Sequence, residues 1–276
     1  MRANVRAPET TDVLVATFYK FVRLDDYRQM QAPIYDFCFE IGLYGTILLA
    51  EEGINGSMSG SPQAIDALLE FLRKDPRLAD LEAKFSRHDD APFKRLRVRL
   101  KKEIVTFGVH ADPTVRAGTR VAPEDWNDLI AQDDIVLLDA RNDYECDVGT
   151  FRGAIEPKIA EFGEFPSYAD KNLDPKKHKR VAIFCTGGIR CEKASAYLLG
   201  KGFEEVYQLD GGILKYIEAV PREESLWQGD CFVFDYRVCV NHDLAATGHR
   251  MCEACQWAVP PGINVCENCG AEAMML

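Results

Sequence analysis

The stretch VAIFCTGGIRCEKASAYLLGKG, residues 181–202, determines the architecture of the central part of the chain. Four apolar residues lead directly into Cys185, and a short loop with two adjacent glycines follows. From Cys191 onward apolar residues recur at helical spacing, and Gly202 is a typical C-terminal stop. The stretch therefore predicts a buried strand, a tight loop and a helix that begins at Cys191.

The loop CTGGIR, residues 185–190, is the candidate reactive site. Backbone N–H groups and the positive end of a helix dipole converge on a thiol in this position, and they can lower its pKa well below about 8.5. The alternative is a buried cysteine that only closes a strand; Arg190 and the glycines favour the reactive site. The candidate residues are Cys185, Arg190 and Cys191 for catalysis, and Thr186, Gly187, Gly188 and Ile189 for binding an anion. Cys191 is either a second thiol or a packing residue at the helix terminus.

Strands and helices alternate on both sides of this loop. Apolar runs at 135–138 and 206–209 predict buried parallel strands, and helices are expected after Pro123 and at 213–219. This alternation predicts a three-layer α/β domain with a parallel sheet, in which ligands bind outside the carboxyl ends of the strands. Residues 149–154 are expected to form a turn, and the polar segment 162–179 a surface excursion.

The N-terminal part of the chain has a different pattern. It predicts strands at 13–22, 46–50, 54–59 and 82–87, a helix at 33–41 and a second helix from Pro62 with Ser61 as its N-cap. The order βαββαβ is typical of a ferredoxin-like α+β domain. This fold hosts many functions, so it defines none by itself.

The segment KRLRVRLKK, residues 94–102, carries a regular alternation of basic and apolar residues. If it is a strand, its basic side chains share one face at a spacing of about 7 Å. They are Arg95, Arg97, Arg99 and Lys101. Such a face is either neutralised by acidic residues of the chain or follows the phosphates of a nucleic acid.

Four of the ten cysteines form two CxxC pairs near the C-terminus. They are Cys252, Cys255, Cys266 and Cys269. Paired CxxC turns present four thiolates, which is the ligand set of a tetrahedral structural zinc site. The alternative is free or redox-active thiols; a catalytic zinc is not expected because cysteines fill all four positions.

Composition and termini restrict the class of protein. With 47% hydrophobic residues in 276, the chain can bury ordinary cores, and its net charge of −11 gives no overall attraction to nucleic acid. No signal-peptide pattern occurs, and the longest apolar run, near 41–50, is far shorter than the roughly 20 residues of a membrane span. We therefore expect a cytoplasmic protein without a disulfide framework and without membrane contact. The absence of a GxGxxG sequence gives no sign of a nucleotide cofactor.

Three motifs resemble those of the rhodanese domain: LLDARNDYECDVGTFRGA at 137–154, CTGGIR at 185–190 and LDGGI at 209–213. In rhodaneses the loop cysteine carries a persulfide, and Cys185 is the matching residue. Phosphatases with a similar loop have one more residue between cysteine and arginine, so the resemblance argues against phosphatase chemistry. Asp139 and Arg141 are expected to be structural and to anchor loops by ion pairs.

Nearly the whole chain resembles the tRNA uridine hydroxylase family. The resemblance rests on CTGGIRCEKASAYL, on GTILLAEEGINGS at 45–57, on PFKRLRVRLKKEIVTFG at 92–108 and on GDCFVFDYRV at 229–238. It implies a ferredoxin-like (acylphosphatase-like) domain, a rhodanese domain and a C-terminal extension, which we place at 1–112, 113–225 and 226–276. It also implies hydroxylation of the wobble uridine of tRNA to 5-hydroxyuridine, with molecular oxygen as co-substrate and the anticodon arm as the bound element.

The sequence is also compatible with two other functions. A rhodanese-type sulfurtransferase would carry a persulfide on Cys185, and a non-catalytic adaptor would use only its zinc and RNA-binding parts. For the hydroxylase, Cys185 could add to C6 of uracil, carry sulfur or become oxidised. The sequence names neither an electron donor nor an oligomeric state.

Overall fold

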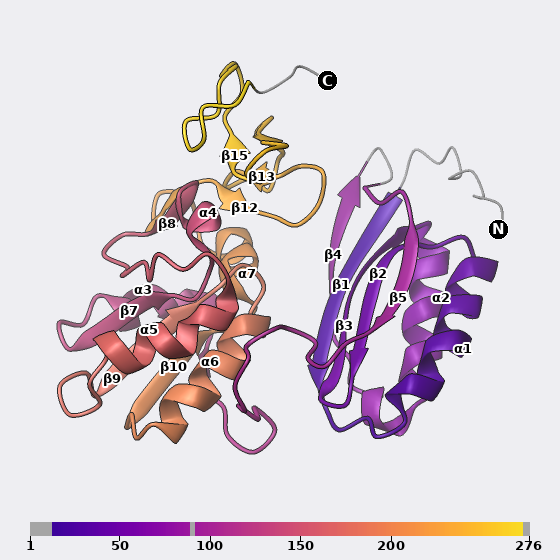
Figure 1. Cartoon of the computed structure of the whole chain (residues 1–276), viewed down its shortest axis with the longest axis horizontal. Coiled ribbons are helices and arrows are strands. Elements are labelled where there is room, and N and C mark those ends of the chain that lie inside the picture. Colours follow the sequence, from indigo (N-terminus) through magenta and orange to yellow (C-terminus); the bar gives the residue numbers. More distant parts are fainter. Residues whose placement is uncertain (1–12, 89–91, 273–276) are drawn as a thin grey trace. The chain divides into compact units, whose positions relative to one another are not determined.

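The structure is a computed structural model that describes residues 13–88 and 92–272 (Figure 1). The chain divides into two compact units, of which the first ends at Thr106 and the second begins at Phe107. The Cys-rich C-terminal segment belongs to the second unit. Within the described residues, no helix has both the length and the apolar composition that crossing a bilayer requires.

The first unit is built on one five-stranded sheet in the order β4-β1-β3-β2-β5 (Figure 1). Neighbouring strands are antiparallel, except that β5 runs parallel to β2. The elements are β1 (Val13–Phe21), α1 (Tyr27–Glu40), β2 (Tyr44–Ala50), β3 (Gly53–Gly60), α2 (Pro62–Arg73), the 3-10 helix η1 (Pro76–Leu78), β4 (Ala83–His88) and β5 (Leu96–Leu100). The predicted ferredoxin-like order is confirmed, and β5 extends the sheet beyond it.

Of the two helices of this unit, α2 begins where the sequence predicts and α1 begins earlier. The Ser61 hydroxyl accepts a hydrogen bond from Ala64 N at 3.2 Å, and Pro62 occupies the first turn of α2, as predicted. Helix α1, in contrast, begins at Tyr27 and not at Pro33 as predicted, and the proline lies inside it. The earlier start is stabilised because Tyr27 packs against the core of the unit.

The second unit contains a four-stranded parallel sheet in the order β6-β10-β9-β7. On one face of this sheet, alternate strand residues pack in a core with helices α3 and α7. On the other face, the Gln208 side chain donates to Glu192 of α6. The predicted α/β domain with a parallel sheet is confirmed. Its elements are β6 (Thr119–Val121), α3 (Pro123–Ile130), β7 (Ile135–Asp139), α4 (Asp143–Cys146), β8 (Gly149–Phe151), η2 (Phe162–Glu164), α5 (Phe165–Asn172), β9 (Arg180–Phe184), α6 (Ile189–Gly200), β10 (Glu205–Leu209) and α7 (Gly212–Ala219).

Two segments of this unit differ from the sequence prediction. Residues 149–154, predicted as a turn, include strand β8, which pairs antiparallel with β11 (Trp227–Gly229). Residues 162–179, predicted as a surface excursion, include α5, because Phe162 and Phe165 are buried with their rings 4.9 and 6.2 Å from that of Phe107. Both differences arise from contacts with residues distant in sequence.

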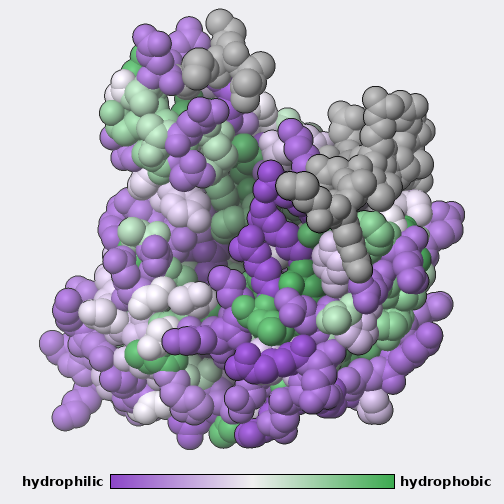
Figure 2. Space-filling model, turned by 45° about the vertical axis from the view of Figure 1, so that its right-hand side comes forward, coloured by the Kyte–Doolittle hydropathy of each residue, from purple (hydrophilic) through white to green (hydrophobic). Residues whose placement is uncertain are grey.

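The end of the chain continues the second unit in short antiparallel pairs. Strand β12 (Cys231–Phe232) pairs with β13 (Cys239–Val240), and β14 (Arg250–Met251) pairs with β15 (Ala258–Val259). Figure 2 shows one face of the molecule, on which hydrophilic side chains predominate and hydrophobic side chains form smaller patches between them.

Candidate active site

Cys185 lies between the carboxyl end of β9 and the start of α6, where the sequence predicted a reactive loop. Its side chain is fully buried. Gly188 has a φ of 100°, a left-handed conformation that favours glycine. This conformation lets the Gly188 N–H donate a hydrogen bond to Cys185 Sγ at 3.1 Å. The loop therefore directs at least one backbone donor at the sulfur.

The loop favours the ionised form of Cys185. Burial alone would raise the pKa of this thiol, but hydrogen bonds from the side chain and backbone of Cys191, the charge of Arg190 and the Gly188 N–H together lower it to about 5. The pKa of Cys191 is raised well above its ordinary value by burial and by the adjacent Cys185. Cys191 is therefore a neutral thiol that donates a hydrogen bond to the Cys185 thiolate.

A second glycine turn holds this loop in place. The N–H groups of Ile213 and Leu214, at the start of α7, donate to the carbonyl oxygens of Cys185 and Thr186 at 3.0 and 3.2 Å. Gly212 has a φ of 70°, and a Cβ there would lie 2.5 Å from the Cys185 carbonyl oxygen. Only glycine permits so close an approach of the two turns.

Arg190 is held by Glu145, a residue that the sequence analysis did not identify. Its Nη2 donates to Glu145 Oε2 at 2.7 Å, its Nη1 donates to Oε1, and the Thr186 hydroxyl also donates to Oε2 at 3.2 Å. Burial opposes the charge of Arg190, but Glu145 and Cys185 outweigh it and raise its pKa. The only sequence signal for Glu145 was its position in a capping box, three residues after the N-cap Asn142 of α4.

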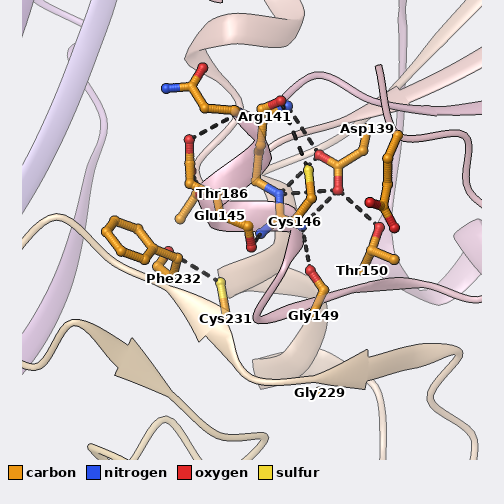
Figure 3. Close-up of polar contacts among 12 residues, drawn as sticks. Asp139, Arg141, Glu145, Cys146, Gly149, Thr150, Thr186, Gly229, Cys231 and Phe232 are labelled. Atoms are coloured by element: carbon orange, nitrogen blue, oxygen red, sulfur yellow. Dashed lines mark hydrogen bonds and ion pairs between the residues drawn. The ribbon is translucent and has the colours of Figure 1, made fainter. Parts of the chain in front are cut away.

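Asp139 and Arg141 form a separate, fully buried ion pair beside the loop (Figure 3). Arg141 Nη2 donates to Asp139 Oδ2 and to the Gly149 carbonyl oxygen, each at 2.6 Å. The Thr150 hydroxyl donates to the same Oδ2 at 2.9 Å. The pair thus ties the end of β7 to α4 and β8, as expected for residues that anchor loops.

The four CxxC cysteines come together in the second unit. Their sulfur atoms all lie within 4.8 Å of one another, with Sγ···Sγ distances of 3.7 Å for Cys252–Cys269 and 3.6 Å for Cys255–Cys266. Four thiolates at about 2.3 Å from a tetrahedral Zn²⁺ would be about 3.8 Å apart. The donor set and the distances therefore fit a zinc ion.

Both CxxC turns have the same backbone geometry. In each, the N–H of the first cysteine donates to the carbonyl five residues on, at 2.8 and 2.9 Å. The carbonyl of the first cysteine accepts from the N–H of Gln256 in one turn and of Gly270 in the other, at 2.9 and 2.8 Å, and both donor residues have positive φ. The repeated geometry places two pairs of thiols opposite each other.

The first CxxC turn also contacts the helix that carries Glu145. The Trp257 indole N–H donates to Asp147 Oδ2 at 3.0 Å, and the Trp257 ring lies edge-on to Tyr144 at 6.1 Å. Tyr144 and Asp147 flank Glu145 in and just after α4. The Cys-rich segment is thus connected through α4 to the residue that holds Arg190.

The four predicted RNA-binding cations lie along β5, at the edge of the sheet of the first unit. Arg97 and Arg99 alternate with Val98, which is buried in the core, while Arg95 and Lys101 flank the strand. Among residues 13–88 and 92–272, none of the four has an ion-pair partner. Direct salt bridges within these ranges therefore do not offset the charge of this face.

The fold and the reactive loop define a rhodanese-like domain that follows an acylphosphatase-like domain. Residues 13–104 match the family described as UPF0176 acylphosphatase like domain, and residues 122–219 match the rhodanese-like domain. A protein from Picosynechococcus sp. named tRNA uridine(34) hydroxylase is 56% identical over 245 residues, which cover 88% of this chain and 82% of that protein. The chain belongs to the tRNA uridine(34) hydroxylase family, as the sequence motifs predicted.

Two solved structures are each similar to part of the chain. A protein of unknown function from Rhodopseudomonas palustris, described as a possible tyrosine phosphatase, is 21% identical with a TM-score of 0.34 and covers 39% of this chain and 84% of its own. A rhodanese-like domain from Anabaena sp. is 18% identical with a TM-score of 0.33 and covers 40% and 78%. Neither likeness bears on function.

Proposed function

We propose that this protein hydroxylates C5 of the uridine at position 34 of tRNA and that Cys185 is its reactive residue. The observation that carries the proposal is the 56% identity to a protein named tRNA uridine(34) hydroxylase over most of both chains. The lowered pKa of Cys185 supports the role of this residue, because a thiolate is the nucleophilic form of cysteine. A tRNA substrate implies a cytoplasmic location.

The chemistry can begin with addition of the Cys185 thiolate to C6 of uracil. The new S–C6 bond breaks the C5=C6 double bond, and the electron pair becomes an enolate whose C5 is nucleophilic. With molecular oxygen as co-substrate, C5 bonds to one oxygen atom and a C5 peroxide forms. Loss of the C5 proton then expels the thiolate and restores the double bond. Two electrons and two protons from a two-electron reductant break the O–O bond, which leaves the C5 hydroxyl and releases water.

The residues around Cys185 have distinct parts in this scheme. Cys191 and Gly188 stabilise the thiolate before it reacts, and loop N–H groups of 185–190 are available to stabilise negative charge that develops on the base. Arg190 acts on Cys185 through its charge and not by a hydrogen bond, because both of its terminal guanidinium nitrogens donate to Glu145. The zinc ion would be structural, since four cysteines leave no position for a substrate.

The cations of β5 are the proposed contact for the anticodon arm. Arg97 and Arg99 project from one face of a strand in a chain of net charge −11. Like charges at this spacing repel each other, and an RNA backbone would relieve the repulsion and release its counterions. The target uridine lies in a single-stranded loop, where its base is accessible.

The test is nucleoside mass analysis of tRNA from cells that lack U34 hydroxylation and express either the wild type or Cys185→Ala. Growth with and without oxygen forms the second comparison. We expect 5-hydroxyuridine only with the wild type and only with oxygen. Equal amounts with Cys185→Ala would exclude Cys185 as the reactive residue, and no product with either protein would exclude the activity.

The match of residues 122–219 to the rhodanese-like domain supports a second candidate, transfer of sulfur from a persulfide on Cys185. Turnover of thiosulfate and cyanide by the wild type, with no change in tRNA hydroxylation in Cys185→Ala, would favour it. Both reactions would use the same Cys185 thiolate. The product that forms, and not the geometry of the site, therefore distinguishes the two candidates.

A further inference from the structure

The hairpin between β12 and β13 exposes two aromatic side chains. Phe234 is 63% exposed and Tyr236 is 53% exposed, whereas Val233 and Val238 at the ends of the loop are buried. Exposed aromatic rings forgo the free energy of burial, so paired exposure in one short loop indicates a binding surface. The loop belongs to the second unit, as does Cys185.

Hydrogen bonds order the backbone of the loop that carries these rings. Between the two aromatic residues Asp235 turns inward, and its carboxylate accepts from Arg237 Nη2 at 2.7 Å and from Arg237 N at 3.0 Å. Val233 N donates to Val238 O at 2.8 Å, which closes the hairpin. The aromatic residues therefore point outward from a loop that is already ordered, and little entropy is lost when they bind a ligand.

Phe234 lies next to the reactive loop. The guanidinium carbon of Arg190 is 5.8 Å from the centre of the Phe234 ring. Phe232, whose ring is 5.3 Å from that of Phe234, is buried against Tyr144 of α4. The exposed Phe234 ring is thus a neighbour of Arg190, which pairs with Glu145. The charge of Arg190 in turn lowers the pKa of Cys185.

We propose that Phe234 and Tyr236 form a base-stacking site for the nucleotides that flank the target uridine; this rests on the proposed function. To reach the buried Cys185, a uracil must leave the stack of its loop, and its neighbours then lose a stacking partner. Aromatic side chains provide that partner for any base. In the loop 233–238, Phe234 and Tyr236 are exposed while the other apolar side chains are buried. Two separate exposed rings can each stack on one base, whereas a protein partner would need a continuous apolar surface.

The first test compares the affinity of an anticodon stem–loop RNA for three full-length variants by fluorescence anisotropy. Phe234→Ala removes the ring, Phe234→Leu keeps an apolar side chain without a ring, and Phe234→Tyr keeps the ring. We expect Phe234→Ala and Phe234→Leu to weaken binding by about 5- to 150-fold, the range for loss of one stacked base, and Phe234→Tyr to bind like the wild type. Tyr236→Ala and Tyr236→Phe form a second pair with the same expectation.

Three outcomes would overturn the stacking site. Binding by Phe234→Ala and Tyr236→Ala equal to that of the wild type would show that neither ring contacts RNA. Wild-type binding by Phe234→Leu would show an apolar contact without stacking. Equal loss in Phe234→Tyr would show that packing of the loop, and not the ring, matters; melting temperature and zinc content check this directly. Because these are binding measurements, they remain decisive even if the wild type forms no 5-hydroxyuridine, a result that would count against the proposed function alone.

Discussion

Glu145 accepts hydrogen bonds from both terminal guanidinium nitrogens of Arg190, and the pair lies in the interior beside Cys185. The charge of Arg190 therefore acts on two anions, the Glu145 carboxylate and the Cys185 thiolate. Because the carboxylate lies against the same guanidinium, we expect it to limit how strongly Arg190 lowers the pKa of the thiol.

Replacement of Glu145 by glutamine should change both the stability of the fold and the pKa of Cys185. The Glu145→Gln variant leaves Arg190 buried without its carboxylate, so the free energy of unfolding should fall by about 3 kcal/mol. Because Arg190 then acts on Cys185 alone, the pKa of Cys185 should fall further below about 5. Chemical denaturation measures the first effect, and thiolate absorbance against pH, with Cys185→Ala as blank, measures the second. Glu223→Gln, at an exposed glutamate, should change the stability by less than about 0.5 kcal/mol; equal effects of both variants would contradict the role of Glu145.

Ionisation of Cys185 makes the stability of the protein depend on pH. The pKa of this thiol is lowered from 9.0 to about 5, so the folded state binds the proton less tightly than the unfolded state does. The contribution of Cys185 to stability is therefore complete above the unfolded pKa and is lost as pH falls toward about 5. The difference in unfolding free energy between wild type and Cys185→Ser should decrease over this range. A difference that does not change with pH would show that Cys185 is not a thiolate.

Two substitutions of Cys191 distinguish a hydrogen-bond donor from a redox-active thiol. Cys191→Ala removes the donor, so the pKa of Cys185 should rise from about 5 toward its ordinary value, and the acidic limb of the activity profile should move to higher pH. Cys191→Ser keeps an O–H donor and should preserve most of the low pKa. If both variants lose hydroxylation while Cys191→Ser keeps the thiolate, Cys191 takes part in the reaction as a thiol.

The strand–loop–helix around Cys185 could be predicted from the sequence because the residues that indicate it are adjacent in the chain. The glycines, the apolar strand and the helical stripe lie within 181–202, and the CxxC spacing is equally local. Glu145 could not be assigned, because its partner Arg190 lies 45 positions away. The same cause explains β8, whose partner strand begins at Trp227, and the burial of Phe162 against Phe107. For α1, the sequence predicts a start at Pro33 because it does not show the packing of Tyr27.

Removal of zinc should affect more than the Cys-rich segment. A chelator is expected to remove one Zn²⁺ per chain and to unfold 250–272, because a segment this small depends on metal binding for its folding free energy. Since Trp257 donates to Asp147, α4 should also lose protection from hydrogen exchange. Addition of zinc should reverse both effects. The Trp257→Phe variant tests the link by itself: we expect unchanged zinc content and weaker protection of α4, and full protection of α4 would contradict the link.

The cations of β5 can be tested by the salt dependence of RNA binding. Arg97→Gln combined with Arg99→Gln removes two positive charges while keeping polar side chains, so affinity for tRNA at low salt should fall. If both residues contact phosphates, the slope of log K against log salt concentration should decrease by about 1.4 to 1.8. The control combines Lys176→Gln with Lys177→Gln, which removes the same charge from two exposed lysines of the second unit. An equal change in both double variants would indicate a general effect of net charge, whereas a change confined to the arginines would identify β5 as the strand along which the RNA backbone lies.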